Sequence, residues 1–135
     1  MSSSDDLYAV ADFCLIPMGT GEPSVRYCHD SQRHHFYTYL RNHPAFYQVA
    51  GYIAECQRIL EKSGLKYKVR RYGTNLEGSW FEVSKAIHDC HLAVHAQGAP
   101  RIATDIRIGT RTDREIAPGT GNEAKVKRVE EILSK

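Results

Sequence analysis

Residues 101–112 alternate between two kinds of side chain, and this alternation constrains the fold more than any other feature. One parity holds isoleucines and threonines, whereas the other holds an aspartate and arginines with small residues between them. Because successive side chains of a strand point to opposite faces, one face suits a core and the other is charged. The apolar parity is Ile102, Thr104, Ile106, Ile108 and Thr110, and the charged parity is Arg101, Ala103, Asp105, Arg107, Gly109 and Arg111.

The small residues on the charged face need an explanation of their own. A solvated strand face tolerates charge, but it does not need Ala103 and Gly109 between an acid and two arginines. Small residues allow close approach, so we expect a ligand or a second sheet to contact this face.

The remaining patterns predict an α+β chain with the order β-α-β-β-α-β and a final helix. This is the ferredoxin-like arrangement, in which two helices cover one face of a four-stranded antiparallel sheet. The other face has no helix in this plan, which favours self-association through the sheets. The expected elements are strand 8–17, helix 50–63, strand 65–72, a short strand through Leu76 and Glu77, a helix after Ser79, strand 101–112 and helix 122–134.

Local signals set the boundaries of these elements. Ser79 and Glu82 have the spacing of a capping box, which satisfies free N–H groups where a helix begins. We expect a turn at 73–75 and a buried apolar stripe on the helix that follows Ser79. That stripe comprises Trp80, Val83, Ile87, Cys90 and Val94.

Length and composition favour a single soluble domain spanning residues 1–135. The chain is 41% hydrophobic and 25% charged, and its net charge of +2 is too small to indicate nucleic acid or an anionic membrane as a partner. There is no run of 18 apolar residues and no secretory signal, so we expect a cytoplasmic protein. The four cysteines are widely spaced, and we interpret them as free thiols.

Residues 25–48 form an atypical insertion between the first strand and the first helix. They hold four of the seven histidines and four of the eight tyrosines and show no clean period. A metal site is one interpretation, but its spacing matches no standard zinc pattern. Alternatively, since valine codons begin with GT and one glutamine codon ends in AG, a retained in-frame intron from Val25 to Gln48 is a hypothesis that transcript sequencing tests. The metal interpretation would use Cys28, His29, His34, His35 and His43.

Motifs for catalysis or metal binding are weak throughout the chain. No phosphate-binding glycine loop, nucleophile elbow or His-Glu-x-x-His motif occurs. His88, His91 and His95 share one helix face, which we interpret as a solvated face rather than a metal stripe. We therefore predict a non-enzymatic protein without a cofactor or metal.

A cluster of polar residues is the candidate ligand site. Thr20 lies in the loop after the first strand, and Thr74, Asn75 and Glu77 lie in the connection between the second and third strands. Asp105 and Arg107 lie on the charged face of 101–112. Asp12, the one charge inside the first strand, is a partner for Arg107 or for a ligand cation. The candidate ligand-binding residues are Asp12, Thr20, Thr74, Asn75, Glu77, Asp105 and Arg107.

Three motifs of the chain resemble a known family, the small thiamine-binding proteins related to YkoF, which were long catalogued as uncharacterised. The resemblance is strongest to the fungal members of this family. The motifs are ADFCLIPMGT at 11–20, YGTNLEG at 72–78 and PRIATDIRIGTR at 100–111. The resemblance covers 8–24 and 49–115, and the insertion departs from it. It implies a ferredoxin-like fold, a tetramer built as a dimer of dimers, and binding of thiamine or its hydroxymethylpyrimidine part without established catalysis.

The residues can support that chemistry in more than one way. A carboxylate can face the cationic thiazolium, threonine or asparagine can bond ring nitrogens, and Phe13, Tyr72 or Trp80 can stack. An arginine can instead favour a phosphate or sulfate, so cation-first and anion-first pockets both stay open.

Two rival functions with testable signals remain at this point, beside a purely structural, interaction-only role. One is a small enzyme or sensor for a phosphorylated or anionic metabolite, whose turnover would be lost on Arg107→Ala. The other is an RNA-binding module, which needs aromatic residues on the central strands. The short strand at 74–77 has no aromatic residue, so we expect no nucleic-acid partner.

Overall fold

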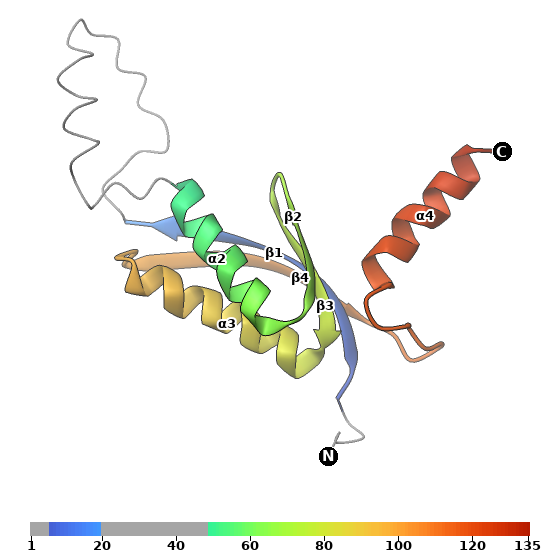
Figure 1. The fold of residues 1–135 in the computed structure, drawn as a ribbon, viewed down its shortest axis with the longest axis horizontal. Helices are drawn as coiled ribbons and strands as arrows, with labels where there is room; N and C mark the ends of the chain where they lie inside the picture. The colour runs from blue at the N-terminus through green and yellow to red at the C-terminus, as the bar shows by residue number, and fades with distance from the viewer. Residues whose placement is uncertain (1–5, 20–48) are drawn as a thin grey trace, which may run out of the picture.

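The computed structural model describes residues 6–19 and 49–135, and it confirms the ferredoxin-like α+β arrangement (Figure 1). The strands form one antiparallel sheet with the order β2-β3-β1-β4. The insertion at 25–48 and Thr20 lie outside the described residues. The elements are β1 (Tyr8–Met18), α2 (Val49–Ser63), β2 (Lys66–Arg70), β3 (Gly73–Ser79), α3 (Trp80–Ala96), β4 (Arg101–Thr110) and α4 (Gly121–Leu133).

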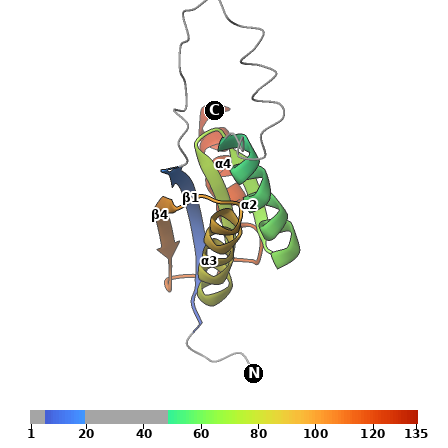
Figure 2. The same cartoon turned by 90° about the vertical axis from the view of Figure 1, so that its left-hand side faces the viewer.

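Helices α2 and α3 cover one face of the sheet, which we call the covered face (Figure 2). The alternation of β1 sends every second side chain into this layer, from Ala9 to Leu15, and all of them are buried. Leu60 of α2 and Leu76 of β3 meet in the same core and are fully buried. Burial of a side chain of this size contributes about 1.5–3 kcal/mol to folding, so the covered face supplies most of the stability.

The β2–β3 turn lies at Arg71 and Tyr72, so the prediction of a turn at 73–75 was wrong. Gly73 is already the first residue of β3 and pairs with Arg70. A Cβ atom at Gly73 would lie 2.7 Å from the carbonyl oxygen of Phe13. The glycine therefore permits close contact between two strands rather than a special turn conformation.

The start of α3 confirms the capping box with one difference. The Ser79 hydroxyl accepts a hydrogen bond from the backbone N–H of Glu82 at 3.2 Å. The same hydroxyl donates to the Glu82 carboxylate, while the backbone N–H of Trp80 donates to the carbonyl of Leu7 at 2.8 Å. Trp80 is 45% exposed, so its assignment to the buried stripe was wrong: it is the first helical residue and lies at the end of the core.

The other face of the sheet, which we call the open face, carries the charged parity of β4, since Asp12 pairs with Arg107 across the strands. Only the N-terminal end of α4 packs on this face. The Glu77 carboxylate accepts a hydrogen bond from the backbone N–H of Asn122 at 3.1 Å. A Cβ atom at Gly121 would lie 2.5 Å from both that carboxylate and Val10, so glycine is required for this contact.

Beyond this anchor, α4 projects from the sheet (Figure 1). Its apolar side chains are 50–80% exposed, so the helix buries little of its own apolar stripe. An exposed apolar stripe of this kind is typical of a surface that another molecule covers. The exposed side chains are Val126, Val129, Ile132 and Leu133.

Two further observations bear on the environment of the protein. Within residues 6–19 and 49–135, no helix is long and apolar enough to cross a membrane. Cys14, Cys56 and Cys90 are free thiols, as predicted, and the latter two are buried in the core. Cys28 lies outside the described residues.

Candidate ligand-binding site

Two adjoining hollows of about 480 and 400 Å³ lie where β1, β4 and the β2–β3 hairpin meet. Asp12, Tyr72, Gly73 and Arg107 line both of them. Hollows of this volume suit a small organic ligand. We call the first the carboxylate hollow, which adds Cys14 and Asp105, and the second the arginine hollow, which adds Arg70, Arg71 and Asn75.

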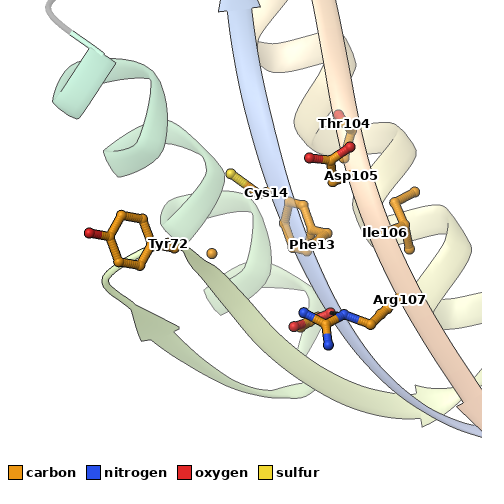
Figure 3. A pocket seen from close by; sticks show the side chains of 9 residues that line it. Phe13, Cys14, Tyr72, Thr104, Asp105, Ile106 and Arg107 are labelled. Carbon is orange, nitrogen blue, oxygen red and sulfur yellow. Dashed lines mark ion pairs between the residues drawn. The ribbon is translucent and has the colours of Figure 1, made fainter.

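The register of β1 and β4 builds the carboxylate hollow. It places Asp12 opposite Arg107 and Cys14 opposite Asp105. The Nε atom of Arg107 lies 3.6 Å from the Asp12 carboxylate, which confirms the predicted partnership (Figure 3). The Arg107 side chain is 91% exposed, so this ion pair is weak and both groups remain accessible to a ligand.

Asp105 differs from Asp12 in having no fixed partner. Within the described part of the chain, no hydrogen bond or ion pair engages its carboxylate. Its side chain lies beside the Cys14 position in Figure 3. An unpaired carboxylate at the side of a hollow can accept hydrogen bonds from a ligand or face a ligand cation.

Asn75 brings an amide to the arginine hollow. Its side-chain oxygen accepts a hydrogen bond from the Nε atom of Arg70 at 2.9 Å, which orients both side chains. The amide nitrogen of Asn75 remains available to donate two hydrogen bonds. Asn75 therefore joins Asp12, Asp105 and Arg107 as a candidate that the structure brings to the hollows.

The side chains of two other candidates, Thr74 and Glu77, are bound outside the hollows. Thr74 is buried, and its hydroxyl accepts a hydrogen bond from the Nε2 atom of Gln57 at 3.1 Å. It therefore borders the arginine hollow while its hydroxyl is bound to α2. Glu77 is only 2% exposed because the start of α4 covers it.

The structure separates the three aromatic candidates for stacking. Phe13 belongs to the core of the covered face. Trp80 begins α3, where its backbone N–H donates a hydrogen bond to the carbonyl of Leu7. Tyr72 is 92% exposed at the tip of the hairpin and borders both hollows (Figure 3). It is the one aromatic of the three whose ring is both exposed and next to the polar groups.

Sequence reasoning missed Cys14, Arg70 and Arg71 as lining residues. Cys14 shares its parity with Asp12 on the first strand, and this signal was sufficient to place it on the open face. Arg71 had no such signal, because its position depends on where the hairpin turns.

Metal binding finds no support in the described ranges. No group of three or more histidine, cysteine, aspartate or glutamate residues there is arranged to hold an ion. His91 contacts the hydroxyl of Thr104 at 2.6 Å, and His95 contacts the carbonyl of Ala99 at 2.7 Å. Two histidines of the expected solvated stripe thus make contacts within the protein.

This fold and these hollows define a small α+β protein with two polar hollows on an uncovered sheet face. The family model of the thiamine-binding proteins matches residues 45–130. The chain belongs to the thiamine-binding protein family. This confirms the resemblance carried by the three sequence motifs.

Curated relatives support the same membership. The chain is 41% identical over 124 residues to the UPF0045 protein sll0230 of Synechocystis, covering 92% of this chain and 78% of that protein. It is 30% identical over 109 residues to the fungal UPF0045 protein ECM15 of Eremothecium gossypii, covering 81% of each. The family is named for binding, and no catalytic function is indicated for it.

Solved structures share the fold. A hypothetical protein, MJ1052 of Methanocaldococcus jannascii, matches with a TM-score of 0.63 and 24% identity over 92% of this chain and 97% of that chain. A Thermotoga maritima protein described as a putative thiamine biosynthesis/salvage protein matches with a TM-score of 0.57 and 15% identity over 90% and 98%. At these identities the likeness establishes the fold alone.

Proposed function

We propose that this protein is a non-catalytic, cytosolic binding protein for thiamine or its hydroxymethylpyrimidine part. The observation that carries the proposal is the carboxylate hollow, which the unpaired Asp105 lines together with Asp12. Thiamine has a cationic thiazolium ring, and carboxylates favour a cation placed against them. Membership of a family named for thiamine binding supports the same ligand.

Each accessible residue of the hollows has a role in this proposal. Asp105 faces the cation, and Asp12 and Arg107, whose ion pair is weak, both remain open to the ligand. The Tyr72 ring, which borders both hollows, stacks on the aminopyrimidine, and the Asn75 amide donates hydrogen bonds to the part of the ligand that enters the arginine hollow. Thr74 and Glu77 support the site through their hydrogen bonds to Gln57 and to the start of α4. Thr20 remains a predicted contact from the adjoining loop.

We also propose that the ligand binds at a subunit interface of a homotetramer. Ile16 is exposed on the open face, and the apolar stripe of α4 is exposed as well. Self-association through these surfaces would enclose hollows that one subunit leaves open to solvent. A cytosolic location is supported by the free thiols of Cys56 and Cys90.

Calorimetry of the full chain with thiamine tests this function, using Asp105→Asn as the key variant. Removal of the Asp105 charge should weaken thiamine binding about tenfold, which corresponds to about 1.4 kcal/mol, and should leave the fold intact. Asp113→Asn is the matched control, since Asp113 binds Arg111 outside both hollows and should not affect binding.

Light scattering of the same samples separates ligand binding from assembly. We expect a tetramer for the wild type and for both variants. If millimolar thiamine produces no heat of binding although the folded tetramer is present, the proposal is wrong. Dissociation of the tetramer by Asp105→Asn, with unchanged affinity per folded subunit, would make this strand an assembly element only.

A further inference from the structure

The two hollows of the open face have opposite net charge. The carboxylate hollow contains Asp12, Asp105 and Arg107, which amount to −1. The arginine hollow contains Asp12 and three guanidinium groups, which amount to +2. A ligand that occupies both hollows must therefore be polarised, with a cationic part and an anionic part.

The guanidinium groups of the arginine hollow are available for binding. Arg70 uses its Nε atom to bond Asn75, which fixes its direction and leaves its two terminal nitrogens to donate elsewhere. Arg71 is exposed and makes no hydrogen bond or ion pair with the residues that the structure describes. Adjacent arginine forks with free donors suit a phosphate group, which accepts paired hydrogen bonds.

The two hollows share part of their lining. Gly73 borders both, and it has no side chain to form a wall between them. The contact between Gly73 and the Phe13 carbonyl excludes any larger residue there. Arg107 also borders both hollows, so a single small molecule can contact both charges.

We propose that the arginine hollow is a phosphate subsite, and that the preferred ligand is a phosphate monoester of a cationic heterocycle. Thiamine monophosphate is the member of this class that we choose as the probe. The inference rests on the proposed function, because the carboxylate hollow must hold the cationic ring. A phosphate monoester carries about −1.5 to −2 charges at pH 7, which complements the +2 of the arginine hollow.

The first experiment compares three ligands by calorimetry on the full chain at low salt. Thiamine monophosphate should bind about tenfold more tightly than thiamine, and inorganic phosphate should bind more weakly than either. The advantage of the ester should shrink at high salt, because exposed charges are screened. It should also shrink between pH 7.5 and pH 5, because the phosphate loses its second charge near pH 6.

The second experiment uses Arg71→Gln, with Arg101→Gln as its control. Arg101 is also exposed, but it lines neither hollow. Arg71→Gln should remove most of the tenfold advantage of the ester, so that the two ligands bind with similar affinity. Arg101→Gln should preserve both affinities.

The outcomes distinguish this inference from the proposed function. If thiamine binds and its monophosphate binds no more tightly, the phosphate subsite is overturned and the proposed function stands. Equal loss of both ligands in Arg71→Gln also overturns the subsite. Inorganic phosphate that binds as tightly as the ester would overturn the preference for a monoester of a cationic heterocycle. If neither thiamine nor its ester binds, the proposed function itself fails.

Discussion

The covered and open faces of one sheet have opposite characters, although the same strands build both. Along β1, Phe13 is buried against the helices, whereas its neighbour Asp12 borders both hollows. The covered face has apolar partners from two helices, and the open face has charges and exposed apolar groups. We infer that stability depends mainly on one face and ligand chemistry on the other, so substitutions should separate the two.

The largest expected effect is on the covered face. Leu76→Ala should lower the free energy of unfolding by about 2–5 kcal/mol, because it leaves a cavity in a fully buried layer. Val69→Ala, on the same side of the exposed edge strand β2, should cost less than about 1 kcal/mol. Urea denaturation measures both, and equal losses would contradict the division between the faces.

A smaller effect should follow from the one place where the open face is tightly packed. Gly121→Ala puts a methyl group against Glu77 and Val10, and should cost about 1–3 kcal/mol of unfolding free energy. Hydrogen exchange should show faster exchange in the first turn of α4. Gly109→Ala, whose methyl group would meet only a carbonyl at 3.9 Å, is the control and should be tolerated.

Thiol reactivity should distinguish the faces without any substitution. Cys14 borders the carboxylate hollow, whereas Cys56 and Cys90 are buried beneath the helices. A hydrogen bond with Cys56, together with burial, raises the pKa of the Cys90 thiol, which keeps it protonated and unreactive. We expect iodoacetamide to modify Cys14 at least about tenfold faster than either buried thiol.

Peptide mass spectrometry of the modified protein measures these rates, and ligand sharpens the comparison. Saturating thiamine should slow modification of Cys14 and leave Cys56 and Cys90 unchanged. Protection of all three thiols to the same degree would indicate general stabilisation of the fold rather than a ligand on the open face.

The smallest expected effect is a pH dependence at the edge of the covered face. Burial lowers the pKa of His91, and the nearby His95 and His88 lower it further. The folded state therefore binds fewer protons than the unfolded state, whose His91 titrates near pH 6.5. Stability should be retained above pH 6.5 and should decline as the pH falls below it.

His91→Gln tests this pH dependence while keeping a polar group near Thr104. The wild type should lose slightly more unfolding free energy than the variant between pH 7.5 and pH 5.5, by about 0.5 kcal/mol or less. Urea denaturation at the two pH values provides the measurement. Parallel curves for the two proteins would contradict it.

Periodicity predicted most of the fold because most elements have one face in the core. The alternation in β1 and β4 and the capping box at Ser79 each depend on residues close in sequence. The turn was misplaced because Gly73 looks like a turn residue, and its contact with the Phe13 carbonyl comes from a distant strand. Ile106 is 48% exposed, contrary to its apolar parity, because β4 is an edge strand that the helices cover incompletely.

The sequence predicts the candidate site wherever the alternation of side chains along a strand decides which face a residue occupies. Asp12, Asp105 and Arg107 share the open face because their strands alternate and pair in register. Glu77 has the same parity as Asn75, yet the start of α4 covers it. That contact joins residues 45 positions apart, and no local pattern encodes it.

The anchor of α4 has a mechanical consequence. A helix of 13 residues is about 20 Å long, and among the described residues this one is held to the sheet only at its first turn. A tilt of about 10° at Gly121 would therefore move the far end of the helix by about 3 Å. The buried Glu77 carboxylate and the Lys66–Glu123 ion pair thus help to fix the direction in which α4 carries the exposed Leu133 away from the sheet.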